Sequence, residues 1–158
     1  MRLLVTLASL TVVAALVPAA APARPDAGAA APRTGPQRMK AIVNAWSERL
    51  NAGDNAGVAR LFAVPSFAVQ GAYVYRFETR AQLAGWHAGL PCSGKIVSIR
   101  ISGRFATAVF RLGNRRTSRC DAPGTLAAAR FEIVGGKVVT WVQVPVPEDA
   151  QDNGGLVA

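Results

Sequence analysis

The stretch FEIVGGKVVTWVQVP, residues 131–145, contains two short runs rich in β-branched and aromatic residues, joined by Gly135-Gly136. Two glycines between such runs are typical of a two-residue hairpin turn, because both turn positions favour a positive φ. With the turn placed there, Ile133 faces Val138, and side chains alternate between the two faces of the hairpin from that pair onward. The alternation makes one face almost wholly apolar, so the sequence predicts that this hairpin covers a core.

The other face of the same hairpin has a mixed character. Continuing the register places Phe131 opposite Thr140 on the apolar face and Arg130 opposite Trp141 on the mixed face. A guanidinium opposite an indole permits a cation–π contact. Two interpretations of the mixed face stay open: long arginine stems shield it, or the sheet of a second copy of the chain covers it.

A second hairpin repeats this separation of faces around a turn at Gly103-Arg104. Ile99 then faces Ala108, Val97 faces Phe110, and the strands are expected over 95–102, 105–112, 126–134 and 137–145. The apolar faces of the two hairpins are rich in small residues (Ala106, Ala108, Ala127 and Ala129). Either a helix packs very close to these alanines, or they leave an unfilled pocket.

Three helices are expected before these hairpins. Apolar residues from Met39 to Leu50 recur at helical spacing and predict a helix over 38–51. Asp54 is suited to cap a short second helix, which Pro65 is expected to stop. Thr79 and Gln82 form a capping-box pattern that predicts the start of a third helix, after a short β segment.

This order of elements resembles the SnoaL-like branch of the nuclear transport factor two-like superfamily. The resemblance covers roughly residues 38–147 and is carried by Asn-x-Gly-Asp at 51–54, Leu-Phe-Ala at 61–63 and Gly-Gly-Lys-Val-x-x-Trp at 135–141. It implies an α+β, cone-shaped roll in which three helices from the N-terminal half pack on a strongly curved antiparallel sheet, with a cavity between them. It also implies that dimers are common, and that members range from isomerases, cyclases and hydrolases to proteins without a reaction.

The two ends of the chain have compositions unlike a folded domain. Residues 3–17 form an apolar run after a basic start, and with Ala-Pro-Ala at 21–23 they predict a signal peptide over 1–23. Residues 24–37, rich in Ala, Pro and Gly, are expected to be a flexible linker, 38–147 the SnoaL-like domain and 148–158 a disordered tail. The run is shorter than a membrane span, so we expect a secreted, periplasmic or cell-envelope protein without a stable membrane anchor.

The two cysteines and the charge narrow the choice of partners. An oxidising compartment favours a disulfide between Cys92 and Cys120, and with His87 as the only histidine, neither a metal site nor a cofactor is predicted. The formal net charge is +9, from 18 basic and 9 acidic residues. The basic residues are scattered, apart from one cluster at 115–119, which favours a solvated surface over a nucleic-acid site.

Candidate site residues follow from the predicted inward faces. His87 is expected to be a partly exposed surface histidine, but a small roll of its helix would turn it to the cavity mouth as a proton carrier near pH 7. Tyr73 and Tyr75 are then weak catalytic partners for it. Acidic residues are expected to face elsewhere, with Asp121 in a loop. The candidate ligand-binding residues are Trp46, Tyr73, Tyr75, Trp86, Ala108, Phe110, Ala129, Phe131 and Thr140.

Three functional hypotheses remain open at this stage. The first is a domain that binds a small apolar or amphipathic molecule without catalysis. The second is a pocket enzyme of isomerase or hydrolase type that uses His87 and a tyrosine. The third is a basic interaction module at the cell envelope. A homodimer is one of the two open interpretations of the mixed sheet face, on which the register places Arg100, Arg111, Arg130 and Trp141.

Overall fold

The computed structural model describes residues 35–152, so the expected signal peptide and nearly all of the expected linker lie outside the described residues. Helices α1 (Gly35–Asn51), α2 (Asn55–Ala59) and α3 (Arg80–Ala88) occupy the N-terminal half, with strands β1 (Phe62–Gln70) and β2 (Tyr73–Phe77) between α2 and α3. Strands β3 (Cys92–Ser102), β4 (Phe105–Asn114), β5 (Leu126–Val134) and β6 (Lys137–Val144) follow, and a short helix α4 (Glu148–Asp152) comes last. The predicted α+β order is confirmed.

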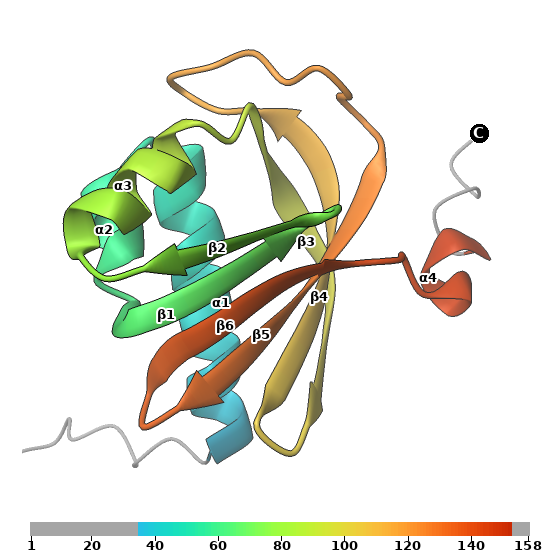
Figure 1. The fold of residues 1–158 in the computed structure, drawn as a ribbon. Coiled ribbons are helices and arrows are strands. Elements are labelled where there is room, and N and C mark those ends of the chain that lie inside the picture. Colours follow the sequence, from blue (N-terminus) through green and yellow to red (C-terminus); the bar gives the residue numbers. More distant parts are fainter. Residues whose placement is uncertain (1–34, 153–158) are drawn as a thin grey trace, which may run out of the picture. The chain divides into compact units, whose positions relative to one another are not determined.

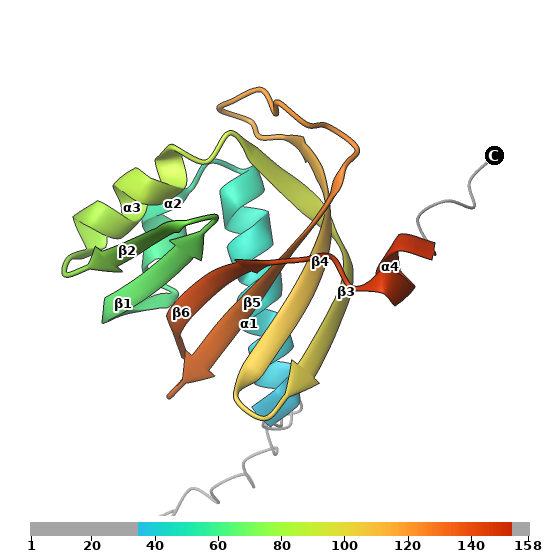
Figure 2. The same cartoon turned by 45° about the vertical axis from the view of Figure 1, so that its right-hand side comes forward.

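The six strands form one sheet in the order β2-β1-β6-β5-β4-β3. The sheet is curved, and α1 lies along its concave side, with α2 and α3 beside β1 and β2 (Figures 1 and 2). Neighbouring strands are antiparallel except β1 and β6, which run parallel. These two are the first strand and the last, and no hairpin joins them, so chain connectivity does not impose an antiparallel pairing.

The helices have the buried face and the N-terminal caps that the sequence predicts. In α1 the residues Met39, Val43, Trp46 and Leu50 are buried, as the apolar spacing predicts. Asp54 caps α2, because its Oδ1 accepts a hydrogen bond from the Gly57 backbone N–H at 2.8 Å. The capping box of Thr79 and Gln82 is likewise formed at the start of α3.

The second helix is shorter than predicted. It ends at Ala59, and Phe62 begins β1 with none of its side chain exposed. Pro65 therefore lies within a strand, in a stretch where the β1–β6 register shifts between Phe62 and Phe67. A proline fits there because an irregular stretch leaves some backbone N–H groups outside the ladder.

The β5–β6 hairpin confirms the turn but corrects the register beyond it. Gly135 and Gly136 have φ values of +58° and +77°, and Ile133 pairs with Val138. A bulge then adds one residue to β6, which pairs Thr140 with Glu132 and Trp141 with Phe131. One extra residue turns every later side chain to the opposite face.

This bulge decides which face receives the large side chain. Trp141 lies in the core at 6% exposure, and the predicted contact between it and Arg130 is wrong. The Arg130 guanidinium instead lies 5.4 Å from the ring centroid of Phe105. Thr140 leaves the core face and donates a hydrogen bond to Glu132 at 3.0 Å.

The β3–β4 hairpin behaves in the same way. Ile99 pairs with Ala108 as predicted, but a bulge at Val97 brings Ile96 opposite Phe110. Val97 is 45% exposed and Ile96 packs against the core, so the predicted inward position of Val97 is wrong. Each hairpin thus keeps its predicted register near the turn and loses it at a bulge farther along.

The convex face of the sheet is partly covered by the end of the described chain. Val109 and Ala128 pair on this face and are almost fully buried in one cluster with Ala150 of α4. Arg100 forms an exposed salt bridge with Asp149. Residues 148–152 are therefore helical, and Ala150 packs on the sheet, in a segment where the sequence predicts disorder. Within residues 35–152, no helix has both the length and the apolar character that crossing a bilayer requires.

Candidate functional site

The centre of the concave side is filled by rings. Trp46 of α1 lies 5.2 Å from Phe131 and 5.5 Å from Phe110, measured between ring centroids. Ala106 and Ala108 are completely buried in the same core. Close packing of helix side chains therefore explains these two alanines. We call this group the central aromatic cluster; its members are Trp46, Phe62, Trp86, His87, Phe110, Phe131 and Trp141.

His87 belongs to this cluster, contrary to the predicted surface position. Its side chain has no exposed area, and both ring nitrogens have partners. Nδ1 donates to the Leu83 carbonyl oxygen at 2.7 Å, and Nε2 accepts from the Trp46 indole N–H at 3.2 Å. The pair of contacts specifies the neutral ring with its proton on Nδ1.

The environment of His87 disfavours its protonation. Burial lowers the pKa of His87 from 6.5 to about 4, the hydrogen bond to Leu83 opposes this shift, and the nearby Arg115 charge adds to it. A second ring proton would also point at the Trp46 N–H. These contacts make His87 a structural group of the core at neutral pH.

The tyrosines lie away from this histidine's two nitrogens. Tyr73 is 70% exposed near the start of β2. Tyr75 is half-buried and stacks against Phe77 with ring centroids 6.3 Å apart and an interplanar angle of 6°. Trp86 packs between Phe77 and Trp141, at 5.6 Å and 5.2 Å. Tyr75 and Trp86 therefore pack against one flank of the core, whereas Tyr73 is exposed.

A pocket of about 270 Å³ remains at the end of the core near the disulfide, which we call the disulfide end. Its aromatic floor is formed by the rings of Trp46, Phe110 and Trp141. Aliphatic and small side chains supply much of the wall, and polar groups come from several elements. The remaining lining residues are Leu50, Gln70, Leu90, Pro91, Cys92, Ser93, Gly94, Leu112, Asp121, Ala127, Ala128, Ala129 and Gln143.

Polar groups of the pocket are few and differ in their partners. The buried indole N–H of Trp141 has no hydrogen-bond partner among the described residues. Gln70 and Gln143 can each donate and accept. An unpaired buried donor carries a desolvation cost, so an acceptor placed near Trp141 by a ligand or water would be favourable.

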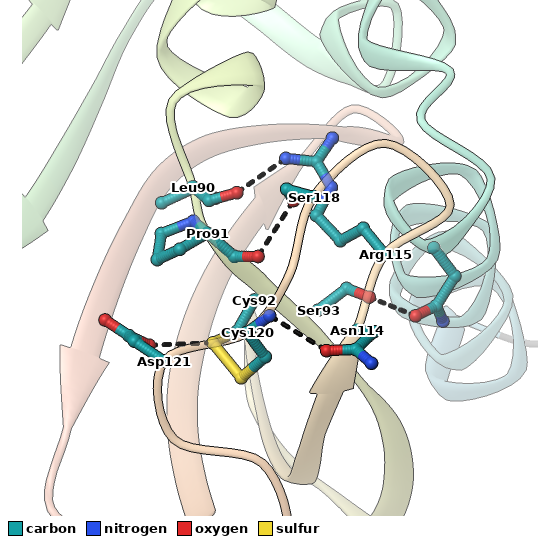
Figure 3. Close-up of a disulfide and its surroundings, with 10 residues drawn as sticks. Leu90, Pro91, Cys92, Ser93, Asn114, Arg115, Ser118, Cys120 and Asp121 are labelled. Carbon is teal, nitrogen blue, oxygen red and sulfur yellow. Dashed lines mark hydrogen bonds between the residues drawn. A yellow bond between two sulfur atoms is a disulfide. The ribbon is translucent and has the colours of Figure 1, made fainter.

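The predicted disulfide between Cys92 and Cys120 is formed (Figure 3), and Cys92 lines the pocket. Asp121 Oδ1 lies 3.0 Å from Cys92 Sγ. The two sulfurs and this carboxylate are close enough together for a metal ion, but sulfurs bonded to each other are not thiolate ligands. The cluster is therefore a crosslink with an adjacent carboxylate.

Arg115 holds the loop that carries Cys120 and Asp121. Its guanidinium donates to the carbonyl oxygens of Leu50, His87 and Leu90 and to Asn55 Oδ1, at 2.5 to 3.1 Å. Only 5% of Arg115 is exposed, and this burial lowers the pKa of its guanidinium. A cation is favourable there because α1 and α3 both direct carbonyl ends toward it.

The rest of the basic cluster also serves the fold. Arg116 donates from Nε to the Ala52 carbonyl oxygen at 2.9 Å, and its backbone N–H donates to that of Asn51. These contacts occupy two arginines of the 115–119 cluster with helix ends. The cluster is thus a tether between the loop and α1.

A second hollow lies on the other side of α1, along β3 and β4. It is about 580 Å³, wide open to solvent and lined by Asn44, Ser47, Glu48, Asn51, Gly94, Lys95, Ile96, Arg111, Leu112, Gly113 and Asn114. Ser47 donates to the Gly94 carbonyl oxygen at 2.9 Å, and Ser93 bonds to Asn51. Glycine at position 94 lets β3 approach β4 closely, since a Cβ there would lie 2.6 Å from the Arg111 carbonyl oxygen. The disulfide-end pocket is more enclosed and has the aromatic floor, so it is the better candidate site.

The structure gathers only part of the predicted site at this pocket. Trp46, Phe110 and Ala129 line it. Ala108 and Phe131 are buried in the filled centre instead, and Thr140 is on the convex face. The inward position of Trp141 depends on a bulge, and the position of Asp121 depends on the loop path, so neither followed from strand alternation.

Comparison with known proteins rests on the fold. Neither protein-family models nor curated proteins give a match to the sequence. Among solved structures, a Sinorhizobium meliloti protein proposed to be a polyketide cyclase aligns with a TM-score of 0.55 and 12% identity, over 68% of this chain and 99% of its own. A nuclear transport factor two-like protein of unknown function from Cytophaga hutchinsonii aligns with a TM-score of 0.55 and 7% identity, over 70% and 92%. A Kribbella flavida protein proposed to be a ketosteroid isomerase aligns with a TM-score of 0.53 and 17% identity, over 77% of this chain and 88% of its own.

Proposed function

We propose that this chain, which has the nuclear transport factor two-like fold, is a binding domain for a small apolar or amphipathic molecule held at the disulfide end, without catalysis. The observation that carries the proposal is the partly enclosed pocket that Trp46, Phe110 and Trp141 line. Pockets of mostly apolar lining with a few polar groups are the usual sites of small ligands.

The volume limits the size of the ligand. Drug-sized ligands occupy pockets of roughly 300–1,000 Å³, and this pocket is about 270 Å³. A molecule with one ring or a short chain is therefore the best fit.

Binding is favoured over the enzyme hypothesis by the position of His87. The enzyme hypothesis requires the histidine and a tyrosine hydroxyl at a shared cavity. His87 is instead buried with both nitrogens bonded, and neither it nor Tyr73 nor Tyr75 lines the pocket. A proton carrier near pH 7 would also need a pKa closer to that value than about 4.

Native mass spectrometry of the full-length protein purified from its producing cell tests the proposal. We expect a small molecule to stay bound, and Ala127→Phe to abolish its retention by filling the pocket. Ala72→Phe is the matched control, because Ala72 is exposed in the β1–β2 turn and the same ring is added there. Equal retention by both variants would contradict the proposed location.

We further propose export of the mature chain, with cleavage after Ala23. The support is the apolar run at 3–17 in the sequence and a disulfide, which is stable in oxidising compartments. The N-terminal residue and intact mass of the protein recovered from the cell envelope or medium provide the test. Material that retains residue 1 would contradict cleavage.

Association of two copies through the convex face is a separate proposal. Phe67 and Val74 are 39% and 69% exposed and alternate to that face, where Arg100, Arg111 and Arg130 also lie. Trp141 is excluded from this surface by the β6 bulge, and α4 occupies one end of it. Sedimentation of the wild type and of Val74→Glu distinguishes a dimer through this face from a monomer.

A further inference from the structure

The charge of the disulfide-end pocket is opposite in sign to that of the protein. The chain has 18 basic and 9 acidic residues, yet Asp121 is the only charged residue among those that line the pocket. Within residues 35–152, no lysine or arginine pairs with the Asp121 carboxylate. Its carboxylate contacts Cys92 Sγ, and the side chain is exposed, so its charge faces the pocket rim and solvent.

The basic residues nearest in sequence form no salt bridge with Asp121 among the described residues. Arg119, two residues away, is exposed. Arg115 and Arg116 donate to carbonyl oxygens at the end of α1 and just beyond it, and Arg111 donates to the Gly124 carbonyl oxygen at 3.2 Å. Figure 3 shows Asp121 on one side of the disulfide, with Asn114 and Ser93 on the other. The side chains of the described loop thus leave a negative charge beside an apolar hollow.

The floor of the pocket has the same electrostatic preference. Trp46, Phe110 and Trp141 are adjacent rings, with Trp46 at 5.5 Å from Phe110 and 6.5 Å from Trp141. Aromatic faces carry negative potential and attract organic cations, most strongly when water is excluded. No fixed positive charge in the lining would repel such a cation, and none would hold a carboxylate or phosphate.

We infer that the pocket selects a small organic ammonium compound, with its apolar body on the aromatic floor and its ammonium group beside Asp121. The inference rests on the proposed binding function and adds the ligand's charge to it. Neutral molecules of the same shape bind more weakly, and carboxylates bind most weakly.

Three one-ring probes of nearly equal size test the selection: benzylammonium, benzyl alcohol and benzoate. Titration of the full-length protein at pH 7, followed by the fluorescence of its tryptophans, gives the three Kd values. We expect benzylammonium to bind about tenfold more tightly than benzoate, because attraction and repulsion at a partly exposed carboxylate contribute about threefold each. This difference in affinity should become smaller as the salt concentration rises.

Two matched variants test whether Asp121 causes the difference in affinity between benzylammonium and benzoate. Asp121→Asn keeps the shape and removes both the attraction and the repulsion, so benzylammonium and benzoate should bind with about equal affinity. Glu48→Gln removes the same charge from the open hollow outside this pocket and leaves the tenfold preference in place.

The affinities of the three probes distinguish the charge preference from the binding function itself. Equal affinities for the three probes, or a gap that survives Asp121→Asn, overturn the inference and leave the binding function standing. No binding of any probe, together with no retained ligand in the native mass spectrum, overturns the binding function as well. A preference for benzylammonium that Asp121→Asn removes and Glu48→Gln preserves supports the inference.

Discussion

The centre of the core and its disulfide end are built on the same concave face of the same strands, yet one is filled and the other is hollow. At the centre, Ala108 is covered by the central aromatic cluster and has no exposed area. At the disulfide end, Ala127 remains half-buried beside an open pocket. The strand pattern is alike in both places, so the elements packed above the sheet determine whether small residues leave space.

The two regions are also held by different means. Ring packing and the His87 hydrogen bonds hold the centre, where the elements meet directly. The disulfide end is covered by the loop at 115–125, which depends on Arg115 and one disulfide. Removing a tether should therefore affect the pocket more than the centre.

The largest effect is expected from Arg115→Ala. The change leaves three backbone carbonyls and Asn55 Oδ1 without their donor and opens a space, so the free energy of unfolding falls by about 3–5 kcal/mol. Chemical denaturation measures it. Arg116→Ala is the matched control and loses less than about 1 kcal/mol, since its side chain is exposed. Equal losses would show that Arg115 is not a special tether.

The next effect comes from removing the crosslink with Cys92→Ser and Cys120→Ser together. The cysteines are 28 residues apart in sequence, and a loop of that length corresponds to about 3.5 kcal/mol of stabilisation in the chain-entropy model. We expect a loss of that order in urea and weaker retention of the ligand. Hydrogen exchange should rise in the loop at 115–125 and stay low in α1; a rise in α1 of equal size would contradict the separation of the two regions.

A similar effect is expected from acid acting on the centre. The pKa of His87 is about 4 in the folded chain and about 6.5 in the unfolded one, so between these values the unfolded state binds more protons. Above about pH 6.5 His87 therefore has no effect on the free energy of unfolding. As pH falls below that value His87 lowers the free energy of unfolding, by about 3 kcal/mol near pH 4.

Urea unfolding between pH 7 and pH 4 measures this dependence. His87→Gln can accept from Trp46 without titrating, so its stability should fall less over the same range. The difference between the two slopes isolates His87 from the carboxylates that also titrate there. Identical slopes would place His87 outside the buried core.

The smallest effects come from adding volume. Ala108→Leu forces extra atoms into the filled centre and should cost about 1–3 kcal/mol. Ala127→Leu places the same atoms at the pocket and should change stability by about 0.5 kcal/mol or less while weakening ligand binding. Thermal unfolding of both variants compares the two regions directly, and a cost at Ala127 as large as that at Ala108 would mean that the pocket is not open.

Much of the fold could be predicted from local sequence patterns. The hairpin turns at Gly103 and Gly135-Gly136, the caps at Asp54 and Thr79, and the pairing of the two cysteines each depend on neighbours in sequence or on compartment chemistry. Less of the candidate site could be predicted. Helical spacing places Trp46 on the inward face, and strand alternation does the same for Phe110 and Ala129. Asp121 lies in a loop, where side-chain direction follows no regular period.

The sequence by itself determined the order of helices and strands, where the chain reverses, and that one face of each hairpin is buried, because these features follow from backbone preferences and side-chain alternation over a few residues. Only the tertiary structure decided that Trp141 faces inward, that His87 is enclosed and that a pocket remains beside the disulfide. The reason is that a curved sheet closing around α1 takes up bulges at Val97 and in β6, and each bulge reverses the faces beyond it.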